Sequence, residues 1–87
     1  KVSHLFPFIS ILRIFKPNVA LKYMKQALNQ EQISGQPKSH VSSTKLNICA
    51  ILSQMKKHKE GIEYAKSAVR DLLEIRQIVE IKQIEDK

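Results

Sequence analysis

Apolar residues recur at steps of three and four along residues 46–73, the pattern that one buried face of an α-helix produces. A short polar stretch, Lys56–Lys59, divides them into two sets. Because this stretch is too polar to bury, the pattern predicts two antiparallel helices, each with one buried stripe. The two stripes are Leu46, Ile48, Cys49, Ile51, Leu52 and Met55, and Ile62, Ala65, Ala68, Val69, Leu72 and Leu73.

Small residues stand where these two helices are expected to come closest. They are Cys49 and Ala50 on the first helix and Gly61, Ala65 and Ala68 on the second. A glycine inside a helix costs about 0.5–1 kcal/mol relative to alanine. The position of Gly61 therefore indicates that two backbones approach each other there.

The first half of the chain predicts another pair of helices. A dense apolar run before Lys16 predicts a helix at about 7–15, since Pro7 suits the first helical turn. Asn18 is expected to cap the next helix, at about 19–32, after a turn that contains Pro17.

The second pair of helices is expected to follow a loop at residues 35–41. Ser42, Ser43 or Thr44 is expected to cap the first helix of this pair, at about 43–55. The last helix meets no helix-breaking residue, so we expect it to be long, at about 60–85.

Part of the pattern recurs at a fixed distance. The stretch Ala20–Leu28 aligns with Gly61–Val69 at a constant offset of 41 residues, with Tyr23/Tyr64, Lys25/Lys66 and Ala27/Ala68 identical. A fixed period of about 20–50 residues is typical of stacked helical repeats. The sequence predicts an all-α fold of antiparallel hairpins, with one repeat in residues 1–34 and another in residues 42–87.

The second hairpin resembles a tetratricopeptide repeat (TPR). The matching residues are Asn47, Ile48, Cys49, Leu52, Gly61, Tyr64, Ala65, Ala68 and Val69. The longer repeat is similar to that of kinesin light chains, which have a Gly, a Pro and a Val before a Leu-Asn pair, as Gly35, Pro37, Val41 and Leu46-Asn47 stand here. The resemblance implies a TPR-like α-solenoid whose structural repeat positions are Ala20, Ala27, Cys49, Gly61 and Ala68.

The resemblance also implies a binding surface. In this family the first helix of each repeat lines a concave face that contacts an extended peptide or a partner helix. The corresponding residues are Ser43, Leu46, Asn47, Ala50 and Gln54 in the second repeat and Leu5, Phe6, Ile9, Leu12 and Arg13 in the first. An amide such as that of Asn47 both donates and accepts hydrogen bonds, as a peptide backbone requires. Two alternatives stay open: Asn47 bonds locally, and the apolar residues of the first helix pack on a neighbour.

The charge is positive and uneven. The chain of 87 residues has a formal net charge of +7; residues 1–45 hold seven Lys or Arg and one acid, whereas residues 46–87 hold eight and seven. A basic half suits RNA or a ribonucleoprotein, an acidic protein surface or anionic lipid. We favour solvated lysines spread over exposed helix faces, because no aromatic residues for base stacking alternate with them.

The sequence contains no catalytic arrangement. Its serines, histidines and acids stand outside any nucleophile-elbow or phosphate-loop pattern, and two glycines cannot make a Gly-rich loop. His4, His40 and His58 lie far apart, and Cys49 has no second cysteine, so no zinc spacing is present. We therefore expect a non-enzymatic protein without cofactor or metal, in which Cys49 is a buried structural thiol.

These observations favour a protein-interaction scaffold or adaptor within a multi-protein assembly. The chain begins with Lys1 and its pattern is already under way, so we expect a segment of a longer protein. Two repeats bury little, so their apolar end faces should be covered by further chain or by a partner. The alternatives are a basic helical module that binds RNA or a ribonucleoprotein, and a regulatory domain of an enzyme.

Composition suggests where such a protein works. The apolar run at residues 5–15 is shorter than the roughly 20 residues of a membrane span and contains Pro7 and Arg13, so we expect no span. The single cysteine is consistent with a reducing compartment, which predicts a cytoplasmic protein. The bias of the chain towards Ile, Lys and Gln is associated with cytoskeletal and ciliary scaffolds.

Overall fold

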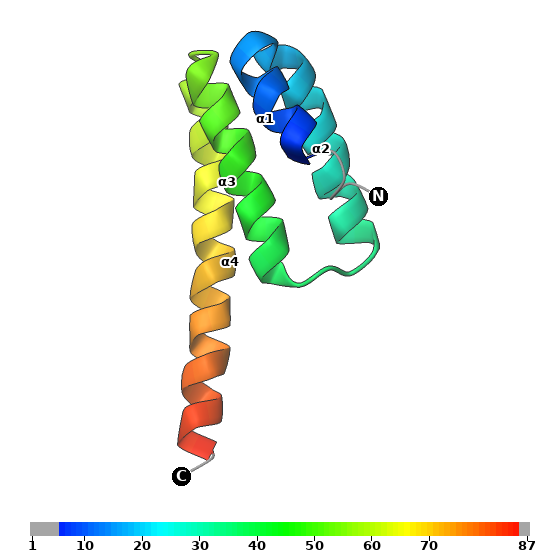
Figure 1. Cartoon of the computed structure of the whole chain (residues 1–87). Helices are drawn as coiled ribbons and strands as arrows, with labels where there is room; N and C mark the ends of the chain where they lie inside the picture. Colours follow the sequence, from blue (N-terminus) through cyan, green and yellow to red (C-terminus); the bar gives the residue numbers. More distant parts are fainter. Residues whose placement is uncertain (1–5, 86–87) are drawn as a thin grey trace.

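The computed structural model describes residues 6–85, and their side chains from Ile11 onwards. Within this range it consists of four α-helices and contains no β-strand (Figure 1): α1 (Phe6–Phe15), α2 (Pro17–Ile33), α3 (Lys38–Gln54) and α4 (His58–Glu85). The predicted all-α fold is confirmed. Each predicted helix is present, although the starts of α2 and α3 differ from the prediction.

The helices pack in the order of the chain. α2 packs against α1 and α3, and α3 packs along α4, in an elongated molecule of 51 × 29 × 19 Å. Figure 1 shows the α1–α2 and α3–α4 turns at one end and the α2–α3 connection at the other. The fold is therefore two helical hairpins placed side by side, joined through α2 and α3.

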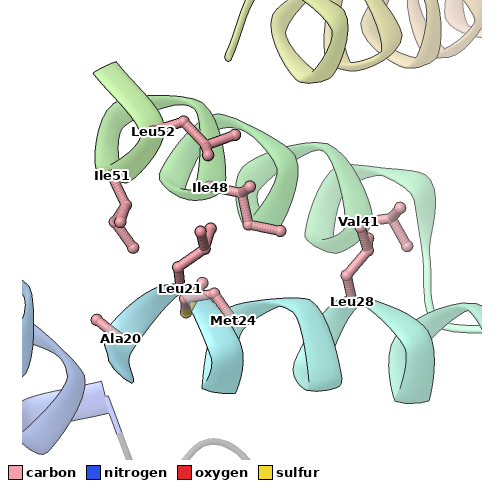
Figure 2. Close-up of a cluster of buried hydrophobic side chains, with 8 residues drawn as sticks. All are labelled: Ala20, Leu21, Met24, Leu28, Val41, Ile48, Ile51 and Leu52. Carbon is pink, nitrogen blue, oxygen red and sulfur yellow. The ribbon is translucent and has the colours of Figure 1, made fainter. Parts of the chain in front are cut away.

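The core lies between α2 and α3. Leu21 and Leu28 of α2 point towards α3, and Ile48 and Ile51 of α3 point towards α2 (Figure 2). The same buried cluster contains Ala20 and Met24 of α2, and Val41 and Leu52 of α3. Full burial of a side chain such as Leu or Ile contributes about 1.5–3 kcal/mol, so this contact holds the hairpins together. Leu12, Met55 and Tyr64 pack at its edge, so each of the four helices contributes to one core.

α2 and α3 end in the same backbone motif. After α2, Gly35 adopts φ +69°, and the amides of Gly35 and Gln36 donate to the carbonyls of Gln32 and Glu31. This is the Schellman arrangement, whose left-handed residue is usually glycine. After α3, the amides of Lys56 and Lys57 donate to the carbonyls of Ser53 and Leu52 in the same way. There the left-handed residue is Lys56, with φ +62°.

Two predicted helix starts were wrong. α2 begins at Pro17, so Asn18 lies inside its first turn; Lys16 occupies the cap position and makes no side-chain cap bond. Proline suits the first helical position because it lacks the amide that would have no partner there.

α3 begins at Lys38, within the predicted loop at residues 35–41. Ser42, Ser43 and Thr44 therefore lie inside the helix instead of capping it. The hydroxyls of Ser42 and Thr44 donate to the carbonyls of Ser39 and His40, so the helix itself satisfies them. Val41 becomes a core residue as a consequence.

The predicted stripe of α4 is not buried along its whole width. Gly61 and Ala68 are buried, but Ile62 and Val69 are 51% and 52% exposed, and Leu72 and Leu73 are exposed as well. The physical reason is that, among the described helices, only α3 packs extensively against α4. The side of α4 that faces α3 is covered, and the adjacent side is exposed. Leu46 of α3, also expected in a buried stripe, is exposed too.

α4 extends past the helix that supports it. Lys38, the first residue of α3, forms an ion pair with Glu74 of α4, so residues 75–85 continue beyond the start of α3 (Figure 1). Four apolar side chains of this extension are exposed: Ile78, Val79, Ile81 and Ile84. The last helix is therefore long, as predicted.

Candidate interaction surface

The residues proposed to bind a partner lie on one side of α3. Ser43, Leu46, Ala50 and Gln54 follow one another at steps of three and four, and Asn47 lies four residues after Ser43, so the five residues share a helix face. Ala50 is half-buried and the other four are exposed. The opposite side of α3 carries the core residues, among them Ile48 and Leu52. Packing on α2 and α4 thus leaves this face free, and we call these five residues the α3 face.

One hydrogen bond joins the α3 face to α1. The side-chain amide of Gln54 donates to the carbonyl oxygen of Arg13 at 2.7 Å. The end of α3 therefore lies directly beside the end of α1. Gln54 is exposed at this junction, and Arg13 is half-buried.

The remaining first-repeat candidates are placed less completely. Leu12 is half-buried and packs against the core, so only part of its surface is free. Phe6 and Ile9 lie in α1 but outside the residues whose side chains the structure describes, and Leu5 lies outside the described residues altogether. The structure therefore brings α1 to the α3 face through Arg13.

A largely buried ion pair fixes α3 on α4. The Lys45 ammonium lies 2.6 Å from a carboxylate oxygen of Asp71, and the two side chains are 11% and 16% exposed. Lys38, at the start of α3, and Glu74 of α4 form a second ion pair, which is half-exposed. Neither pair was predicted from the sequence. The partners lie 26 and 36 positions apart in the chain, so their contact depends on the register in which α3 packs on α4.

The predicted close approach of α3 and α4 is present at Gly61. A methyl group added at Gly61 would lie 3.4 Å from the Cys49 carbonyl oxygen and 3.8 Å from the Cys49 Sγ. Cys49 is a half-buried free thiol. Ala20, Ala27 and Ala68 are buried, with exposures of 0%, 3% and 0%. All five repeat positions therefore lie at helix contacts or next to them.

The described residues offer no metal cluster and no membrane span. Among them, no three His, Cys, Asp or Glu side chains are placed to hold a metal ion together. Within the same residues, no helix is both long enough and apolar enough to cross a bilayer. The chemistry of the α3 face is that of two aliphatic side chains, two amides and a hydroxyl, which are groups for contact and hydrogen bonding.

Comparison with models of protein families, with curated proteins and with solved structures finds no match. The function is therefore proposed from the geometry of this chain.

Proposed function

We propose that this chain is a TPR-like segment of a non-enzymatic scaffold, which binds other protein chains within a larger assembly. The supporting observation is that the 41-residue recurrence coincides with a recurrence in space. Ala20–Leu28 lies in α2 and Gly61–Val69 in α4, so each stretch belongs to the second helix of a hairpin. Ala20 and Gly61 are buried, and so are Ala27 and Ala68, as equivalent positions in stacked repeats should be.

The same alignment accounts for the open side of α4. Leu21 and Leu28 of α2 are buried in the core with α3, whereas their equivalents Ile62 and Val69 are exposed. In α2 this side meets the first helix of the next hairpin. In α4 the described chain offers no further hairpin to cover it. An apolar stripe of this kind is what a repeat unit presents to a neighbour.

The α3 face is the part of the proposed scaffold that would hold a partner. We expect an extended peptide to lie across α3 towards Arg13, with Leu46 giving apolar contact. The amides of Asn47 and Gln54 would supply hydrogen bonds to the peptide backbone. Gln54 already uses its amide nitrogen in the bond to Arg13, so Asn47 is the freer donor.

Selection of binders from a random peptide library on the immobilised 87-residue chain tests this proposal. For the selected peptides, Asn47→Ala should weaken binding about five- to tenfold, the equivalent of one net hydrogen bond. Gln26→Ala provides the control, because Gln26 is an exposed amide on α2, away from the α3 face. Peptides that bind equally well to both variants and to the unchanged chain would contradict the proposed site.

A further inference from the structure

A second surface of different chemistry lies at the end that carries the α1–α2 and α3–α4 turns. Lys16 stands in the first turn, and Lys56, Lys57 and Lys59 stand in and next to the second; all four are exposed. The turns lie at the same end of the molecule (Figure 1), and the bond from Gln54 to the Arg13 carbonyl joins them. We call these four lysines the basic end.

Few acids balance the basic end. The sequence contains no Asp or Glu in residues 11–30 or 38–59, and the nearest carboxylate along the chain is Glu60. By contrast, Lys38 and Lys45, towards the opposite end, have Glu74 and Asp71 as partners. The fold thus places Lys16, from the first half of the chain, at the same end as Lys56, Lys57 and Lys59 from the second half.

Fold stability explains these lysines only in part. Lys16, Lys56 and Lys57 follow the C-termini of α1 and α3, where the helix dipole favours positive charge. Lys16 also precedes α2, and Lys59 lies in the first turn of α4, where the dipole disfavours positive charge. Lys56 adopts the left-handed conformation that the equivalent position after α2 gives to Gly35. Residues held in disfavoured conformations concentrate at functional sites. Lys56 and Lys59 thus stand where other residues would suit the helices better.

Apolar side chains stand beside the basic end. Seven of the ten α1 residues are Phe, Ile or Leu, and the helix contains Arg13 and no acid. Its last turn exposes Ile14 and Phe15, at 71% and 76%, directly before Lys16. Exposed aliphatic and aromatic side chains next to lysines are typical of helices that rest on a lipid surface.

We propose that this end binds the surface of an anionic membrane. Ile14 and Phe15 enter the headgroup layer, and Lys16, Lys56, Lys57 and Lys59 contact lipid phosphates and carboxylates. A bilayer surface fits better than an acidic peptide or RNA, because exposed apolar side chains stand directly beside the lysines. A membrane can take up these side chains together with the charges, whereas RNA would require stacking platforms along the lysines.

Sedimentation of the 87-residue chain with lipid vesicles tests the proposal. We expect binding to phosphatidylcholine vesicles that contain about 30% phosphatidylserine, weak binding to pure phosphatidylcholine, and loss of binding at about 1 M salt. The triple variant Lys56→Gly/Lys57→Gln/Lys59→Gln should bind about a hundredfold more weakly. Glycine is chosen at position 56 because it relieves the left-handed conformation, so weaker binding would not reflect misfolding.

Two further variants separate charge from apolar contact. Lys25→Gln/Lys66→Gln/Lys82→Gln removes the same charge from exposed positions elsewhere and should keep most of the binding. Phe15→Ser removes an exposed ring and should weaken binding to the same vesicles about tenfold. Equal weakening by the two triple variants would overturn the proposal. So would binding of a single-stranded RNA or a polyglutamate peptide without binding to the anionic vesicles.

Discussion

Lys56 occupies a backbone position that the α2–α3 connection gives to Gly35. Both residues close the same Schellman motif, with φ +62° and +69°. A side chain in the left-handed region costs about 1 kcal/mol, because its Cβ crowds the following carbonyl. The same motif is therefore less favourable with Lys56 than with Gly35 at the left-handed position.

Lys56→Gly is expected to stabilise the fold by about 0.5–1 kcal/mol, after the greater freedom of glycine in the unfolded chain is taken into account. Urea denaturation followed by circular dichroism measures the change. Lys57→Gly serves as the control, since Lys57 has no positive φ and gains nothing from glycine. A similar gain in both variants would show that charge, and not backbone conformation, is responsible.

Gly61 offers a second test at the scale of one residue. An added methyl group would meet Leu52 Cβ at 3.6 Å and the Cys49 carbonyl at 3.4 Å, which is van der Waals contact without overlap. Gly61→Ala should therefore stabilise α4 by about 0.5–1 kcal/mol through its helix propensity. Gly61→Val adds two methyl groups beyond that contact and should destabilise the protein by more than about 1 kcal/mol. Thermal unfolding of both variants measures the contrast.

At the scale of the elements, the α3–α4 hairpin depends on one ion pair more than on the other. Asp71→Ala leaves the Lys45 ammonium largely buried without its partner, and should destabilise the protein by about 2–3 kcal/mol. Glu74→Ala breaks the half-exposed pair with Lys38, and should change stability by less than about 0.5 kcal/mol. The midpoints of urea denaturation measure both effects; equal effects would disprove the distinction.

The helices could be predicted from the sequence because their signals are local. The apolar spacing of Ile48, Ile51 and Leu52 predicts a helix with one apolar side, and this is the side of α3 that faces the core. The start of α3 was missed because three consecutive hydroxyl residues resembled caps, whereas Pro37 already precedes the helix. The pair of Lys45 and Asp71 could not be found, since it exists only after α3 and α4 have taken their register.

At the scale of the whole molecule, equivalent apolar positions differ in what covers them. The five residues of the α3 face were predicted from the resemblance to TPRs, and the structure places them on the side of α3 away from the core. The exposure of Ile62 and Val69 could not be predicted, since helical periodicity shows that residues share a face but not whether another helix lies against it. Their equivalents Leu21 and Leu28 carry the same pattern and are buried.

This difference in burial predicts that substitution by lysine has a small effect on stability at Ile62 and a large effect at the equivalent position, Leu21. Ile62→Lys should change the free energy of unfolding by less than about 0.5 kcal/mol and should lower self-association, because the side chain is half exposed. Leu21→Lys places a charge in the core and should prevent folding. Circular dichroism and sedimentation velocity distinguish the two variants. Unfolding of the Ile62 variant would show that α4 is covered on that side.

The end of α4 beyond Glu74 fixes how far Ile81 and Ile84 lie from the start of α3 and in which direction they point. Residues 75–85 rise about 16 Å beyond Glu74, at 1.5 Å per residue. Any surface that meets Ile81 and Ile84 is thus held in a set orientation to α3. One residue inserted after Glu74 would turn those side chains by about 100° and leave the core contacts untouched. The distance and the rotational orientation of these side chains therefore depend on the number of residues in the helix, which would not be so in a flexible tail.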